Sequence, residues 1–430
     1  MTQAPMAADA MPVTVAKMER RRLPVAALLG ANTISLIGNV ITAMAIPWYV
    51  LETTGSAAKT GLVGVCTVLP TVIAAFLGCA VVDRLGFKRT SLLADLLSGV
   101  TVALIPLLHQ TVGLAFWQLL TLVFLGSLLD APGVTARQAL FPDVAQAAGL
   151  ALERGNAAFQ LVNRLSQLLG PPLAGVLIVA FGASQVLWVD AATFAVSALL
   201  IGLMMPSPDT APAPSTGTTR GMRRYWDEMR EGIAFIRQDR LLRTLAVTVA
   251  ITNAVDAPLV GVALPVFARE TFSSATALGL LEAGFGAGAV LGSLAFAAVG
   301  HRLPRRRTYI MAFQLVALPL GVLALTPPLW IGVGALAVAG VAASPLNPIL
   351  MTVSQERVPS ALRGRVFGAS TALALAAMPV GLLLGGLLIE RAGVIVTLVV
   401  IAATYLAATA VLWLIPALHD MDRPRPLGEG

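Results

Sequence analysis

The sequence repeats itself at a fixed distance of 218 residues, and this constrains its fold more than any other feature. A charged stretch between two apolar runs, from Gly78 to Arg89, returns in the second half from Phe296 to Arg307. The same distance relates Arg84 to Arg302, Leu85 to Leu303, Lys88 to Arg306, Arg89 to Arg307, Pro47 to Pro265, Glu52 to Glu270, Thr53 to Thr271 and Gly61 to Gly279. Because no gap interrupts this register, the chain is predicted to contain two copies of one structural unit.

Both copies consist of apolar segments long enough to cross a membrane, for which a helix needs about 20 mostly apolar residues. The sequence is 57% hydrophobic and only 12% charged, which is too little charge for an ordinary solvated surface. We therefore predict an all-α integral membrane protein with twelve transmembrane helices, six in each half. The predicted spans are residues 24–50, 60–82, 90–109, 114–136, 157–180, 185–205, 241–266, 277–300, 308–326, 329–353, 366–389 and 394–416.

The segments outside the spans complete the predicted organisation. It consists of an N-terminal tail, 1–23, a first six-helix half, 24–205, a linker, 206–240, a second half, 241–416, and a C-terminal tail, 417–430. The linker begins rich in Pro, Thr and Ser and is predicted to become a surface helix from Arg223 to Arg237. No cleavable apolar segment precedes the first span, which we expect to act as an uncleaved targeting signal.

Positive charge predicts the orientation in the cell membrane. With the N-terminus in the cytoplasm, 25 of the 29 Lys and Arg residues lie in cytoplasmic segments. Only Lys59, Arg269 and Arg391 lie on the opposite side, and Arg164 lies within a span. The positive-inside rule therefore predicts that both termini and the linker are cytoplasmic.

The charged loop between the second and third spans resembles the best-known motif of the major facilitator superfamily, Gly-x-Leu-Ala-Asp-Arg-x-Gly-Arg-Lys. The matching positions are Asp83, Arg84, Gly86 and Lys88, and Arg89 extends the basic run. Cys79 stands in place of the first Gly, with Gly78 just before it, and Phe87 replaces a basic residue. The resemblance covers residues 24–416.

A second motif, in the fifth span, resembles the Gly-Pro-x-x-Gly-Gly sequence of the superfamily's exporters. Here Gly170, Pro171 and Gly175 match, whereas Ala174 and the preceding Ser166 replace Gly. Small residues and Pro within a helix permit close packing and bending. The runs Arg137-Gln138-Ala139-Leu140-Phe141-Pro142 and Glu231-Gly232-Ile233-Ala234-Phe235-Ile236-Arg237 are similar to those of the branch that contains macrolide-efflux and siderophore-export proteins.

This resemblance implies a secondary transporter that works by alternating access between its two halves. We expect a proton-coupled exporter, an antiporter, of small amphipathic molecules such as drugs or siderophores. The alternatives are an importer of a small metabolite on the same fold and a membrane sensor that does not transport. The expected partners are the lipid bilayer, protons and the substrate, with no nucleic acid, and the chain is expected to be monomeric.

Polar residues within the spans indicate where transport takes place, because such groups are costly in hydrocarbon. Four of them share one face of the first span, and this face is either a cavity wall or a helix–helix contact. They are Asn32, Ser35, Asn39 and Thr42. In the seventh span, Asp256 is our leading candidate for a carboxylate that takes up a proton or recognises a cation, with Asn253 beside it; alternatively, Asn253 or Thr252 satisfies this carboxylate locally.

The fourth, fifth and eighth spans add further candidates. Asp130 is either a proton relay or a structural partner of Arg137 or of the charged loop. Glu282 is either a gate or proton site or a hydrated carboxylate at the rim. On the fifth span Arg164 either binds an anionic or acidic group or extends to the cytoplasm, and the amides Gln160, Asn163 and Gln167 share its face.

The substrate site is predicted between the halves, lined by the first, fourth, fifth, seventh, eighth and tenth spans. Asp95 and Asp190 are expected to be structural, near the ends of their spans. No histidine has a metal-ligand neighbour, and no phosphate-binding loop or nucleophile elbow occurs, so we expect no metal, no cofactor and no enzymatic activity.

The two copies of the charged loop differ in two informative positions, because Asp83 becomes His301 and Gly86 becomes Pro304. Only the first copy combines an acid with a basic run. We expect Asp83 to fasten the cytoplasmic side in the outward-facing state, near the start of the eleventh span, and the second copy to act mainly as a topological anchor.

Overall fold

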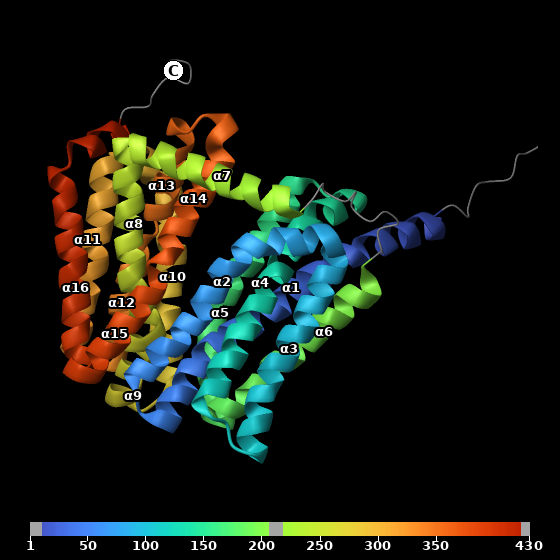
Figure 1. Ribbon diagram of the computed structural model, residues 1–430, viewed down its shortest axis with the longest axis horizontal. Coiled ribbons are helices and arrows are strands. Elements are labelled where there is room, and N and C mark those ends of the chain that lie inside the picture. The colour runs from blue at the N-terminus through green and yellow to red at the C-terminus, as the bar shows by residue number, and fades with distance from the viewer. Residues whose placement is uncertain (1–10, 206–217, 423–430) are drawn as a thin grey trace, which may run out of the picture.

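The computed structural model describes residues 11–205 and 218–422, and within these ranges every regular element is a helix (Figure 1). Twelve helical segments in the described ranges are long and apolar enough to cross a membrane. The predicted all-α architecture with twelve spans is therefore confirmed. Large apolar side chains such as Val176, Leu199 and Leu294 remain exposed on the outer surface, as expected for contact with lipid.

The first half consists of α1 (Met11–Thr54), α2 (Ala57–Leu85), α3 (Phe87–Thr111), α4 (Phe116–Ala147), α5 (Leu152–Phe181) and α6 (Ala183–Met204). The second half consists of α8 (Arg240–Pro258), the π-helical turn η1 (Leu259–Ala263), α9 (Leu264–Phe272), α10 (Ala275–Val299), η2 (Gly300–Arg302), α11 (Arg305–Ala324), α12 (Leu329–Ala343), α13 (Leu346–Arg357), η3 (Ser360–Leu362), α14 (Arg363–Ala376), α15 (Met378–Ala392), α16 (Val394–Ala410), η4 (Val411–Leu414) and η5 (Pro416–Asp422). The linker contributes α7 (Thr218–Gln238), which contains the predicted surface helix.

Several helices extend beyond the predicted spans. The α1 helix begins at Met11, inside the predicted N-terminal tail, and α4 continues to Ala147 instead of ending at residue 136. A run of apolar residues predicts only the part of a helix that lies in the hydrocarbon core. The helix itself can continue beyond that core into polar sequence, because its backbone hydrogen bonds do not depend on lipid. As a result Arg137, predicted in a cytoplasmic segment, lies within α4.

Three spans of the second half are interrupted near prolines. The seventh span changes from α8 to the π-helical η1 after Pro258, the tenth breaks at Ser344-Pro345, and the eleventh breaks just before Pro379. Proline lacks a backbone N–H and clashes with the preceding turn, so it interrupts the helical hydrogen bonds. Backbone irregularity of this kind within a membrane is tolerated where protein or a cavity surrounds it.

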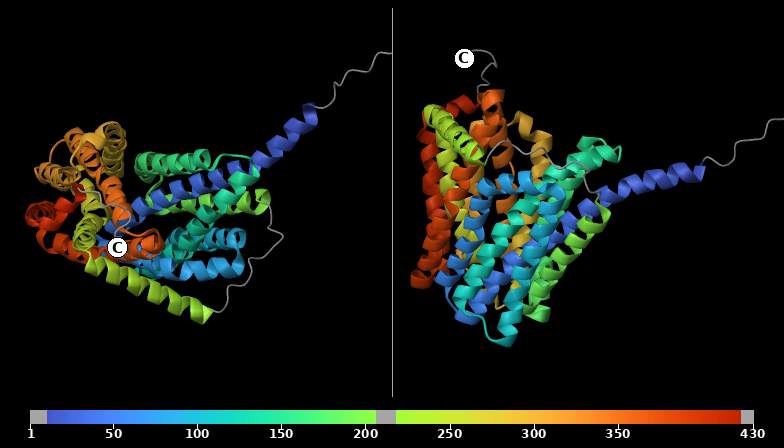
Figure 2. Two further views of the ribbon diagram at one scale, coloured as in Figure 1. Left: turned by 90° about the horizontal axis from the view of Figure 1, so that it is seen from above. Right: turned by 45° about the vertical axis from the view of Figure 1, so that its right-hand side comes forward.

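The linker helix α7 is fixed to the second half. Arg365 donates a hydrogen bond to Glu231 at 2.6 Å, and Gly232 lies directly against the backbone carbonyl of Arg365. Asp239, which follows α7, caps α8 through Leu241 N at 2.8 Å and accepts from Arg357 at 2.9 Å. Viewed from the side that carries it, here called the linker side, α7 runs along the edge of the bundle (Figure 2).

The two halves are joined at the opposite, distal side, where turns at Gly55, Gly182 and Gly393 adopt positive φ angles. A continuous apolar core here includes Trp48 and Leu51 of the first half with Phe267 and Ile389 of the second. On the linker side the cores are separate clusters within each half. The halves diverge toward the linker side (Figure 1), and α2–α15 and α5–α10 are the principal helix pairs between them.

Candidate functional site

A cavity of about 830 Å³ lies between the halves. Its lining residues come from α1, α2, α3, α4 and α6 of the first half and from α8, η1, α9, α10 and α15 of the second. Most of the wall is aliphatic, and the charged lining residues are four acids, Asp130, Asp190, Asp256 and Glu282. A volume of this size accommodates a drug-sized molecule.

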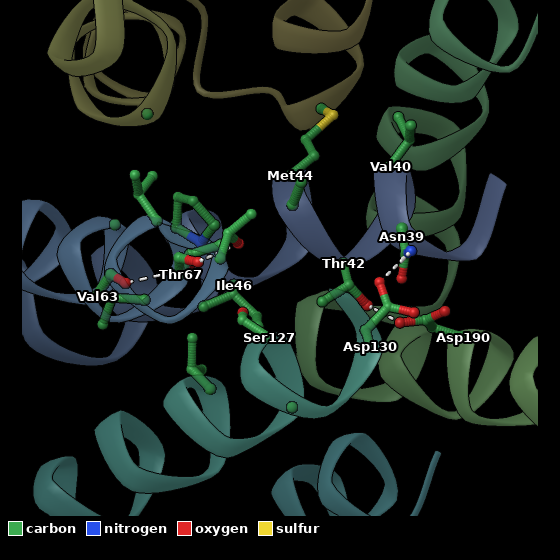
Figure 3. Close-up of a pocket in the computed structure, with 18 of the residues that line it drawn as sticks. Asn39, Val40, Thr42, Met44, Ile46, Val63, Thr67, Ser127, Asp130 and Asp190 are labelled. Carbon is green, nitrogen blue, oxygen red and sulfur yellow. Dashed lines mark hydrogen bonds between the residues drawn. The ribbon is translucent and has the colours of Figure 1, made fainter. Parts of the chain in front are cut away.

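Two of these carboxylates lie on the wall of the first half, facing one turn of α1 (Figure 3). Asn39 Nδ2 donates a hydrogen bond to Asp130 Oδ2 at 2.9 Å, and Thr42 Oγ1 donates to Asp190 Oδ2 at 2.5 Å. Thr193 on α6 also donates to Asp190, at 3.0 Å. The polar stripe of α1 therefore reaches the cavity at Asn39 and Thr42.

The other half of that stripe packs inside the bundle. Asn32 and Ser35 are buried and are not among the lining residues. Ser35 Oγ accepts a hydrogen bond from Arg137 at 3.3 Å. The polar face of α1 therefore forms part of the cavity wall at Asn39 and Thr42 and a helix–helix contact at Asn32 and Ser35.

Arg137 forms a fully buried ion pair behind the cavity wall. Its Nη1 lies 2.6 Å from Asp95 Oδ1, and both side chains have no exposed surface. Ser197 on α6 donates to the second oxygen of Asp95 at 2.6 Å, whereas Asp130 Oδ1 lies 3.9 Å from Arg137 Nη2. A buried arginine needs a paired and hydrogen-bonded carboxylate, and Asp95 is the closer partner.

The carboxylate of Asp256 lies on the wall of the second half, one turn before the π-helical segment η1. Tyr405 on α16 donates a hydrogen bond to its Oδ2 at 3.1 Å. Asn253 instead donates to the carbonyl of Ala374 at 3.1 Å. The partner of Asp256 is therefore not Asn253 or Thr252 on its own helix but Tyr405 on α16. Spacing in the sequence cannot reveal such a contact between two helices.

Glu282 projects into the cavity from α10 and has no hydrogen-bond or ion-pair partner among the described residues. Its neighbours on the same helical stripe, Gly279 and Gly286, pack closely against Pro171 and Leu168 of α5. The glycines hold the helices together, and the carboxylate remains available to solvent or ligand.

The predicted polar face of α5 does not line this cavity. Gln160, Arg164 and Gln167 are exposed and Asn163 is half-buried, on the part of α5 near the linker side. Neither this helix nor the tenth span contributes a lining residue, whereas α2, α3, α6 and α15 do so without having been predicted. Asp190, expected to be structural, also lines the cavity, and its buried carboxylate accepts hydrogen bonds from Thr42 and Thr193.

The exporter-like motif of α5 lies at contacts with other helices. Gly170 packs against Val40 of α1, Gly175 against the backbone of Ala275, and Gly279 against the carbonyl of Pro171. Small residues are required at these positions because a side chain would collide with the neighbouring helix. The motif therefore joins helices and does not form the cavity wall.

The charged loop between α2 and α3 is described in part, since the side chains of Asp83 and Arg84 and the surroundings of Gly78 lie outside what the structure describes. Gly86 has φ of 76°, a conformation that favours glycine, and Lys88 Nζ donates to the carbonyl of Met205 at 2.6 Å. Arg89 is exposed.

The second copy of this loop is held by different contacts. Pro304, at the position equivalent to Gly86, precedes α11 with an ordinary negative φ. Arg305 donates two hydrogen bonds to Glu356 at 2.6 and 3.0 Å, and Arg306 donates to the carbonyl of Trp413 at 2.8 Å. The two copies therefore each connect consecutive spans but differ in backbone conformation and in contacts.

Comparisons with known proteins agree with this architecture. Residues 21–425 match the family described as transmembrane secretion effector. The multidrug efflux pump Tap of Mycolicibacterium fortuitum is 32% identical over 405 residues, covering 94% of this chain and 98% of that protein. Macrolide efflux protein A of Streptococcus pyogenes is 23% identical over 366 residues, covering 84% of this chain and 88% of that protein.

Solved structures show the same fold. A mutant of the nucleoside transporter NupG superposes with a TM-score of 0.75 at 13% identity, covering 91% of this chain and 99% of that chain. A bacterial homologue of the human lysosomal transporter Spinster, solved in an inward-facing and unoccupied conformation, gives a TM-score of 0.71 at 16% identity, covering 95% and 99%. The predicted resemblance is confirmed, and the chain belongs to the transmembrane secretion effector family of the major facilitator superfamily.

Proposed function

We propose that this membrane transporter is a proton-coupled exporter of small amphipathic molecules, and that the cavity between its halves is the substrate site. The observation that carries the proposal is an apolar cavity bounded by both halves and containing four carboxylates. The named efflux activities of the related proteins support the direction of transport.

Coupling would use a carboxylate that alternates between a protonated and an ionised, substrate-facing state. Each elementary charge that crosses the membrane potential releases about 2.3 kcal/mol per 100 mV. Asp256 is our principal candidate because it lines the cavity and lies beside the irregular turn η1. Asp130 and Glu282 line the same cavity, whereas Arg164 lies outside it and receives no role here.

Alternating access would exchange the present arrangement, joined at the distal side, for one joined at the linker side. We place the linker, α7 and both termini in the cytoplasm, because the basic residues gather there. A single chain contains both halves and the whole cavity, so one chain suffices for transport.

The experiment uses inverted membrane vesicles from cells that produce the full chain. An imposed proton gradient, acidic inside, is expected to drive uptake of an exported dye in the wild type and to fail in Asp256→Asn. The exposed acid Glu270 provides the control, Glu270→Gln. Gradient-driven uptake that survives Asp256→Asn would reject the proton site, and movement only in the opposite direction would favour an importer.

A further inference from the structure

The geometry points to lipophilic organic cations as the ligands of the cavity, with the positive group held by carboxylates of both halves. This inference rests on the proposed function, because it takes the cavity to be the substrate site. It restricts the proposed amphipathic substrates to those that carry a positive charge.

The charge of the cavity wall is entirely negative. Its lining residues include Asp130, Asp190, Asp256 and Glu282 and no Lys, Arg or His. Arg137 has no exposed surface; it is paired with Asp95 at 2.6 Å and lies 3.9 Å from Asp130 behind the wall. An anionic ligand would therefore find no cationic side chain on the wall, and its repulsion by any ionised carboxylate would be uncompensated.

The carboxylates keep unused acceptor capacity toward the cavity. Asp130 Oδ1 is buried and lies 3.9 Å from Arg137 Nη2, so the partly exposed Asp130 side chain meets the cavity through Oδ2, which accepts one hydrogen bond from Asn39. Asp256 accepts from Tyr405 through Oδ2 alone, and Glu282 accepts from no described residue. A cation entering the cavity would supply the missing partner, which lowers the cost of burying an ionised carboxylate.

The remaining wall suits the apolar body of such a ligand. Val40, Val68, Leu122, Val134, Val260 and Met378 line the cavity with partly or fully exposed side chains and so contribute aliphatic surface from both halves. Burying apolar area stabilises binding by about 25 cal/mol per Å². A hydrophobic body with a single positive centre therefore matches the wall better than a polar or anionic chelator does.

The experiment compares two ions of nearly equal size and opposite charge, tetraphenylphosphonium and tetraphenylborate. Binding to the purified full chain in lipid nanodiscs is measured by equilibrium dialysis at neutral pH, with empty nanodiscs subtracted. We expect saturable binding of tetraphenylphosphonium and at least about tenfold weaker binding of tetraphenylborate, because only the cation gains the charge pairs. Equal affinities, or binding of neither ion, would overturn the inference.

Isosteric variants test which carboxylates hold the cation. Asp130→Asn, Asp256→Asn and Glu282→Gln are each expected to weaken tetraphenylphosphonium binding about tenfold, with Glu270→Gln unchanged. Glu282→Gln removes no hydrogen bond within the described structure, so it tests charge even where an Asp variant folds poorly. Unchanged affinity in all three variants would contradict the assignment.

The outcome separates this inference from the proposed function, because equilibrium binding needs no proton gradient. Charge-selective binding without gradient-driven uptake would leave the cation site in place and reject proton-coupled export. Gradient-driven export together with equal binding of both ions would reject the cation site alone.

Discussion

Gly61 on α2 and Gly279 on α10 occupy equivalent positions at the two junctions between the halves. A Cβ atom on Gly61 would lie 2.5 Å from the carbonyl oxygen of Leu382 on α15, and one on Gly279 would collide with the carbonyl of Pro171 on α5. The internal repeat places these two glycines in the same register. The repeat is therefore visible in the structure as two related helix–helix junctions.

The partner helices complete each junction with a glycine of their own. A Cβ atom added to Gly386 on α15 would lie 2.8 Å from the carbonyl oxygen of Ala57. One added to Gly175 on α5 would lie 2.6 Å from the carbonyl oxygen of Ala275. Ala57 and Ala275 are again related by the repeat distance. Small residues on both sides let the backbones approach closely, as is common between membrane helices.

Replacing Gly61 by Val is expected to weaken the distal junction. Overpacking of this kind costs about 1–3 kcal/mol, so the arrangement joined at the distal side should become less populated and transport should fall. Distances between spin labels at Lys59 and Arg391, exposed on opposite halves, measure the change. Gly321→Val is the control, because no atom lies within 4 Å of a Cβ added there; equal transport by the two variants would contradict the prediction.

Glu390→Ala is expected to loosen the same junction by removing one hydrogen-bonded cap. Glu390 Oε2 accepts from Ala58 N and from Ser56 Oγ, both at 3.1 Å, and so caps α2 from the opposite half. Loss of a cap costs about 0.5–2 kcal/mol, which should shift the spin-label distances toward separation. The exposed Glu270→Ala should leave them unchanged, and identical distance distributions for both variants would argue against the cap.

Arg137→Met is expected to destabilise the first half severely. Among the described residues it leaves the buried carboxylate of Asp95 with only Ser197 as a partner, and breaking a buried ion pair from one side costs about 3–5 kcal/mol. Thermal unfolding in detergent, followed by size-exclusion chromatography, provides the measurement. The double variant with Asp95→Asn should recover part of the loss, and the exposed Arg154→Met serves as control.

Tyr405→Phe is expected to impair transport because it removes the hydrogen bond to Asp256. A lost hydrogen bond to a charged group costs about 1.5–3 kcal/mol, and the freed carboxylate would lose its fixed orientation. Tyr309→Phe is a matched control in the same cluster, since the Tyr309 hydroxyl is buried without a partner among the described residues. Vesicle transport measured for both should fall only in Tyr405→Phe; similar rates would exclude a role for this contact.

Asp83→Asn is expected to reduce transport without reducing membrane insertion, because the first copy of the charged loop alone carries an acid. Arg307→Gln in the second copy should have little effect, since Arg307 is exposed. Arg305 is a poorer control than the sequence indicates, because it is bound to Glu356. Equal losses in Asp83→Asn and Arg307→Gln would show that the two loops act alike.

The sequence alone determined the class, the number of spans and the two-fold repeat. These follow from local properties: a helix in lipid must be apolar over its length, and a duplicated unit keeps its spacing. The fourth span shows the limit of this reasoning. The charge of Arg137 predicted that the span ends at residue 136, whereas the helix continues to Ala147. The compensating partner, Asp95, lies on another helix.

Only the tertiary structure decided which polar residues meet. Asn39 with Asp130, Thr42 with Asp190 and Asp256 with Tyr405 are contacts between helices far apart in the sequence. A polar face on one helix is compatible with a cavity, a helix–helix contact or an exposed surface, and α1 shows the first two and α5 the third. Periodicity determines which residues share a face, whereas the rotation and pairing of the helices determine what that face contacts.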